Sequence, residues 1–114
     1  MPLNEHEISL EEAVALVTRY RKELKNIVQP NYASALPFAE TFSKDVFAKL
    51  NEVPGSVSVR AYLGLDEKKQ VRLIFTAVDA KNEDILPNDG GALFEYGQRC
   101  PPVCSGGPLN PTQR

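Results

Sequence analysis

The chain has 114 residues, enough for one compact domain and too few for a second. Hydrophobic residues make up 42% and charged residues 25%, the balance of a globular rather than a disordered protein. The formal net charge of −2 excludes the strong positive field that would attract nucleic acid or an anionic membrane, so neither is an expected partner. No apolar run approaches the roughly 20 residues of a membrane-spanning helix, and the first residues lack a secretory signal, so we expect a cytoplasmic location.

Residues 1–8 are expected to form a flexible lead-in to a long amphipathic helix. Ser9 and Glu12 have the spacing of a capping box, in which a hydroxyl oxygen accepts a hydrogen bond at the start of a helix. Apolar residues then recur every three or four positions, as on one helix face: Leu10, Ala13, Val14, Val17, Tyr20, Leu24, Ile27 and Val28. The helix is predicted to end near Gln29, because Pro30 disfavours its continuation.

A second, short helix is predicted after a connector over residues 31–41. Ser43 is a favourable N-cap for this helix, and Asp45 would lie in its first turn. One face would carry the apolar residues Val46, Phe47 and Leu50. The Pro54-Gly55 pair is expected to end it.

Two strands that form a hairpin are predicted next. Apolar and polar residues alternate from Val57 to Leu63, the period of a half-buried strand. A polar turn over residues 64–70 leads to a second strand, Val71 to Asp79, that is apolar on both faces and therefore typical of a central, covered strand. Residues 92–96 are predicted to form a third strand, because a hairpin alone is marginally stable.

These elements predict a single α+β domain over residues 1–114. It would contain the N-terminal amphipathic helix, the second short helix and a three-stranded, mostly antiparallel sheet made of hairpin 57–79 and strand 92–96. Both helices are expected to pack chiefly on one face of this sheet. Residues 100–114 are rich in proline and glycine, so we expect an irregular tail, neither helix nor strand, laid against the domain.

Several short motifs occur in a distinctive order along the chain. They are Phe42-Ser43-Lys44-Asp45, Pro54-Gly55-Ser56-Val57, Tyr62-Leu63-Gly64, Val78-Asp79-Ala80, Glu95-Tyr96 and Cys100-Pro101-Pro102-Val103-Cys104. In this order they resemble a group of small bacterial proteins, and the Cys-Pro-Pro-x-Cys segment is the most distinctive piece. The resemblance covers most of the chain. It implies a small bacterial domain, and it implies no activity, cofactor, partner or catalytic residue.

Cys100 and Cys104 are the candidate redox or metal-binding residues. In a reducing cytoplasm they are expected to start as thiols. A disulfide requires a turn, such as one centred on Pro102-Val103, because an extended segment would hold the two Cα atoms about 12 Å apart and a disulfide spans at most about 7 Å. The spacing is one residue longer than in thioredoxin-like motifs, and residues 105–108 prevent a following helix. Zinc would need further ligands from a carboxylate, a second subunit or the single histidine, His6; cysteines without such a function are the third alternative.

The second face of the hairpin is the candidate binding surface. It carries Arg60, Tyr62, Arg72 and Ile74, and tyrosine and arginine are common anchors of protein interfaces. The alternative is that the tail, a helix or a second copy of the chain covers this face. In either case something is expected to pack there, since apolar residues exposed together would form an unusual patch.

No group of residues predicts catalysis. The chain has one histidine and no tryptophan, and Asp89-Gly90-Gly91 lacks the pattern of a phosphate-binding loop. The predicted function is therefore a non-enzymatic protein-interaction or self-associating module, a possible homodimer, that uses the second sheet face or the Pro-rich tail. A thiol-based redox or metal-binding function through Cys100 and Cys104 is the alternative, and no other cofactor is expected.

Overall fold

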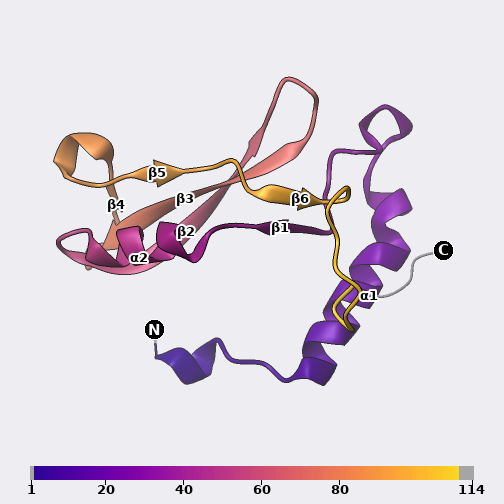
Figure 1. Ribbon diagram of the computed structural model, residues 1–114, viewed down its shortest axis with the longest axis horizontal. Helices are drawn as coiled ribbons and strands as arrows, with labels where there is room; N and C mark the ends of the chain where they lie inside the picture. The colour runs from indigo at the N-terminus through magenta and orange to yellow at the C-terminus, as the bar shows by residue number, and fades with distance from the viewer. Residues whose placement is uncertain (1, 111–114) are drawn as a thin grey trace.

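The computed structural model describes residues 2–110, and the fold class in that range is α+β, as predicted. The chain is elongated, with principal extents of 46 × 36 × 23 Å. Figure 1 shows a sheet with helix α2 packed on it and helix α1 standing beyond its end. No helix within residues 2–110 has both the length and the apolar character needed to cross a membrane.

Helix α1, Leu10–Ile27, begins where the capping box predicts. The Ser9 hydroxyl oxygen accepts a hydrogen bond from the Glu12 N–H at 3.0 Å. The helix ends two residues before Gln29, and a short 3-10 helix, η2 (Pro30–Tyr32), begins at Pro30. The lead-in contains another 3-10 helix, η1 (Leu3–Glu5), and residues 2–9 are all exposed.

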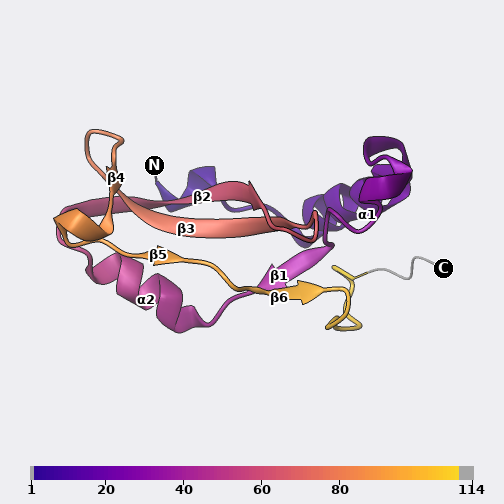
Figure 2. The ribbon, with the colours of Figure 1, turned by 90° about the horizontal axis from the view of Figure 1, so that it is seen from above.

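The expected position of α1 on a sheet face is wrong. None of its residues is buried, and the helix lies beyond the end of the sheet (Figures 1 and 2). The Tyr20 hydroxyl donates a hydrogen bond to the Pro37 carbonyl at 2.8 Å, and the Arg21 guanidinium lies 3.7 Å from the centroid of the Phe38 ring. The irregular connector between the helices therefore occupies part of the apolar stripe that was expected to pack on the sheet.

Helix α2, Lys44–Glu52, is confirmed with its predicted cap, because the Ser43 hydroxyl oxygen accepts a hydrogen bond from the Asp45 N–H at 3.2 Å. It packs on one face of the sheet (Figure 2). The buried cluster there consists of Leu50, Val53, Ala77 and Ile85. The Phe75 ring extends this core, with its centroid 4.8 Å from that of Phe42 and 5.1 Å from that of Phe47.

The predicted hairpin forms the main sheet. Strand β2 (Ser56–Leu65) pairs antiparallel with β3 (Val71–Asp79). The third strand is present in shorter form as β5 (Leu93–Phe94), and β4 (Asp84–Ile85) adds one that was not predicted. Both pair with the other edge of β3, so β3 is central, as its two apolar faces predict, and β2 is an edge strand.

A second, two-stranded sheet was not predicted. Strand β1 (Ala39–Thr41) lies in the expected connector, and β6 (Gln98–Cys100) includes the first residue of the expected irregular tail. They pair antiparallel, with Glu40 opposite Arg99. Three-residue strands are too short for an alternating pattern to be recognised. Beyond β6 the described tail reaches α1, while residues 1 and 111–114 of the expected lead-in and tail lie outside the described range.

Asp66 organises the turn between β2 and β3. One of its carboxylate oxygens accepts hydrogen bonds from the backbone N–H of Lys68 at 2.8 Å and of Gln70 at 3.0 Å. These donors, that of Gln70 first, lower the pKa of Asp66 from its ordinary value of 3.8. The carboxylate thus offsets part of the strain at Lys69, whose φ of 63° lies in the left-handed region that favours glycine.

Asp66→Asn should make the fold less sensitive to acid. A carboxyl group with a lower pKa in the folded than in the unfolded chain stabilises the fold above the unfolded value, and this stabilisation disappears as pH falls through the folded value. Below about pH 4 the free energy of unfolding should therefore fall more steeply for the wild type than for the variant, which does not titrate. Urea unfolding followed by circular dichroism measures both slopes, and equal slopes would contradict the prediction.

Candidate functional site

Two of the predicted binding residues meet on the second sheet face through Asp84 of β4. The Arg60 guanidinium and the Asp84 carboxylate are 2.7 Å apart, and the Tyr62 hydroxyl donates a hydrogen bond to the other Asp84 oxygen. The neighbouring Tyr62 hydroxyl, and after it the Asp84 carboxylate, raise the pKa of Arg60. Asp84 thus fixes the orientation of both side chains.

The other two predicted residues lie further along the same face. Arg72 pairs with Glu95 at 3.1 Å and donates to the Gly97 carbonyl at 3.2 Å. Ile74 is half-buried, and its Cδ1 lies so close to Gly64 that a Cβ there would be 3.2 Å away. The four residues therefore form two separate ionic contacts on either side of Ile74 rather than one convergent pocket.

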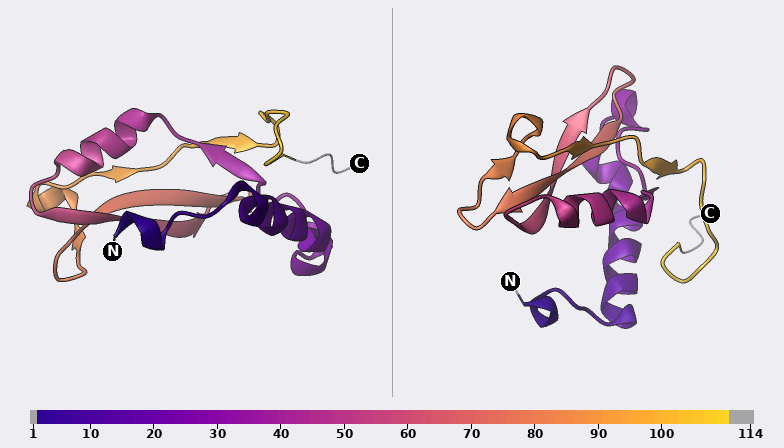
Figure 3. Two further views of the ribbon diagram at one scale, coloured as in Figure 1. Left: turned by 90° about the horizontal axis from the view of Figure 1, so that it is seen from below. Right: turned by 60° about the vertical axis from the view of Figure 1, so that its left-hand side comes forward.

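The covering of this face differs from the expectation. Figure 3 shows α2 on one side of the sheet and α1 beyond its end, so neither helix covers the other side of the sheet. The centre of the face is nevertheless enclosed, because Thr76 and Val78 are 0% and 2% exposed. On the opposite face, which α2 covers only in part, the edge-strand side chains of Val59, Leu63 and Leu65 remain exposed.

Cys100 and Cys104 form a disulfide, with their Cα atoms 4.9 Å apart. The structure therefore differs from the expected thiols and has the turned backbone that a disulfide requires. The Val103 N–H donates to the Arg99 carbonyl at 3.1 Å, which closes the turn. Cys100 is 6% exposed, whereas Cys104 lies at the surface.

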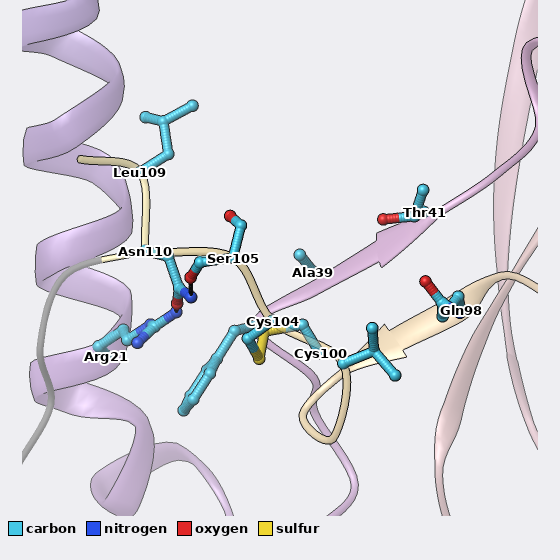
Figure 4. Close-up of a pocket in the computed structure, with 11 residues that line it drawn as sticks. Arg21, Ala39, Thr41, Gln98, Cys100, Cys104, Ser105, Leu109 and Asn110 are labelled. Atoms are coloured by element: carbon cyan, nitrogen blue, oxygen red, sulfur yellow. Dashed lines mark hydrogen bonds between the residues drawn. A yellow bond between two sulfur atoms is a disulfide. The ribbon is translucent and has the colours of Figure 1, made fainter. Parts of the chain in front are cut away.

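The disulfide borders a cavity of about 330 Å³ between α1, β1 and the tail (Figure 4). Arg21 reaches into it from α1 and donates a hydrogen bond to the Asn110 side-chain oxygen. His6, the proposed extra zinc ligand, instead lines a separate depression beside Val57. Within residues 2–110 no three His, Cys, Asp or Glu side chains are grouped so that they could hold a metal ion.

Sequence reasoning missed a buried charged pair, Glu40 and Arg99, at the junction of the two sheets. Their side chains are 1% and 9% exposed, and their charged groups are 3.8 Å apart. Arg99 also donates to the carbonyls of Ser34 at 3.1 Å, of Ala35 at 3.2 Å and of Val71. Within the described part of the chain neither Glu40 carboxylate oxygen has a hydrogen-bond partner. A lone glutamate in a predicted connector carries no sequence signal for such burial.

Tyr20 lies close to the same junction, and its hydroxyl is partly withdrawn from water. Burial raises its pKa, and the nearby positive charge of Arg99 opposes that rise. The Tyr20 hydroxyl therefore stays protonated and remains the donor in its hydrogen bond to Pro37.

No protein-family model, curated protein or solved structure matches the chain. The resemblance to small bacterial proteins stays a prediction. The candidate sites therefore rest on the geometry of this chain alone.

Gly97→Ala should destabilise the junction. A Cβ at Gly97 would lie 2.6 Å from a Glu40 carboxylate oxygen and closer still to the Phe42 ring. Because the Phe42 ring also packs on Phe75, we expect the free energy of unfolding to fall by about 1–3 kcal/mol. Chemical denaturation measures the change.

The matched control is Gly106→Ala, because a Cβ at Gly106 would meet no atom within 4 Å. Its free energy of unfolding should stay within about 0.5 kcal/mol of the wild type. Similar losses for the two variants would contradict the close packing around Gly97.

Proposed function

We propose that the chain is a protein-interaction module that acts by self-association, as a homodimer. The observation that carries this proposal is the exposed surface of the single chain, 8567 Å². A compact monomer of 12.6 kDa would expose about 6,200 Å². The surplus of about 2,400 Å² exceeds the roughly 800 Å² that each partner contributes to an interface of standard size.

The small core supports the same proposal. The radius of gyration is 16.1 Å, whereas a compact chain of this length would have about 13 Å. Large apolar side chains consequently remain exposed on α1 and β2, among them Leu10, Leu16, Ile27, Leu63 and Leu65. Exposed apolar surface of this extent is typical of protein interaction sites. With a net charge of only −2, two copies would repel each other weakly.

The molar mass in solution tests the proposal. At tens of micromolar, light scattering after size exclusion should give about twice the 12.6 kDa of the single chain. Dilution should release monomer, because dimerisation depends on concentration. Sedimentation equilibrium at high and low salt should show a salt-insensitive mass, since apolar contacts are not screened. A mass of one chain at every concentration up to about 1 mM would contradict self-association.

A thiol–disulfide function of Cys100 and Cys104 is the second candidate, favoured by the unequal exposure of the two cysteines. In the proposed cytoplasmic location, a thiolate of a dithiol protein would attack the accessible Cys104 sulfur. The Cys100–Cys104 bond would break, a mixed disulfide would form on Cys104, and Cys100 would leave as a thiolate and take up a proton. The second thiol of the reductant would then attack the mixed disulfide, so that the reductant is oxidised and both cysteines are reduced.

Single variants separate the two sulfurs. Cys100→Ser leaves the exposed Cys104, which should form a mixed disulfide with oxidised glutathione about tenfold faster than Cys100 does in Cys104→Ser. Mass spectrometry of the intact proteins follows both adducts. Equal rates in folded variants would contradict the second candidate, and circular dichroism of each variant shows whether the fold is kept.

A further inference from the structure

We infer that two copies of the chain pair edge to edge through β2, antiparallel about a two-fold axis at Ala61. This inference rests on the proposed self-association and identifies its contact surface. It would join the two main sheets into one continuous sheet.

The outer edge of β2 is free to pair. β2 has ten residues and pairs with β3 on one side, and no strand within residues 2–110 pairs with its other side. Long edge strands attract other strands, and monomeric proteins usually block them with lysine, proline or a covering loop. β2 contains neither lysine nor proline. Residues 2–9 are exposed throughout and lie beyond this edge in Figure 1, where His6 borders a depression with Val57 and Val59, so pairing along the first part of β2 requires this segment to move aside.

The β2–β3 turn fixes which backbone groups of β2 point outward. The Asp66 N–H donates to the Gln70 carbonyl at 3.0 Å, so the backbone groups of Asp66 face β3. The pairing with β3 is regular from Ser58 to Leu65, after a bulge at the start of β2, and facing alternates along this stretch, so its even-numbered residues face β3 and its odd-numbered ones face away. The outward donors and acceptors therefore belong to Val59, Ala61, Leu63 and Leu65.

A pairing centred on Ala61 matches these outward groups. Ala61 would lie opposite Ala61 of the second copy, and Val59 opposite Leu63 in both directions, with backbone hydrogen bonds exchanged at each pair. On one face all of these side chains are apolar. On the other face Arg60 would lie opposite Tyr62 of the second copy, but Asp84, on the far side of β3 from the free edge, holds both side chains, so they add no contact across the new pair.

The register centred on Arg60 is less favourable. Centring the pair on Arg60 would place two like charges directly opposite each other. Asp84 already holds Arg60 and Tyr62 in place in the single chain, so little side-chain freedom would be lost on pairing.

Cross-linking of Ala61→Cys tests the register. Hydrogen-bonded antiparallel pairs have Cα atoms about 5.5 Å apart, within the span of a disulfide. Mild oxidation should therefore produce at least about tenfold more covalent dimer from Ala61→Cys than from Leu65→Cys, whose residue would lie opposite Val57. Wild type oxidised in the same way shows how much covalent dimer Cys100 and Cys104 form by themselves.

Leu63→Lys tests the edge without a cross-link. Leu63 is 75% exposed, so the substitution should leave the single chain folded while it weakens the dimer by about tenfold or more. Leu109→Lys, at an exposed tail residue, should leave the dimer unchanged. A wild-type dimer that neither cross-links through residue 61 nor weakens with Leu63→Lys would overturn the edge pairing and leave self-association intact. A wild-type monomer at every concentration would overturn both.

Discussion

The antiparallel ladder between β2 and β3 is the constraint on which the rest of the structure depends. It aligns Val59 with Ala77 and Ala61 with Phe75, and helix α2 builds the core against that face. β4 and β5 close the ladder on the β3 side only. A nine-residue helix cannot cover a ladder this long, so the apolar residues of β2 stay exposed. The free edge and the small core are thus two consequences of one arrangement.

The junction around Arg99 joins the second sheet to this ladder. Arg99 of β6 donates to carbonyls of the connector and of β3, which ties three segments together. The side chain of its partner Glu40 is almost fully buried, and the Glu40 carboxylate lies 3.8 Å from the Arg99 guanidinium. A buried carboxylate with so few contacts is costly to desolvate. The Glu40–Arg99 pair therefore contributes more to the relative position of the two sheets than to the free energy of unfolding. It fixes the start of the Cys100–Cys104 loop, because the Val103 N–H bonds to the Arg99 carbonyl.

The sequence predicted the elements that carry a repeated signal. The capping box at Ser9, the cap at Ser43 and the alternation along the hairpin each combine several residues, and each element is present. β1 and β6 were missed because three residues cannot establish a period. The position of α1 was mistaken because periodicity identifies an apolar stripe without identifying what covers it. Burial of Glu40 and the order of strands arise from tertiary contacts, which local patterns do not contain.

Helix α1 is involved in both candidate functions, because it contacts the tail that follows the disulfide and also exposes apolar side chains to a second copy. Most of the stability of an amphipathic helix such as α1, with 18 residues, comes from packing of its apolar face. In the single chain those contacts come from the connector and, through Arg21 and Asn110, from the tail beyond the disulfide. They leave Leu10, Leu16 and Ile27 exposed. A partner that covers the remaining apolar residues would stabilise the helix, so α1 would gain from self-association as well as the β2 edge.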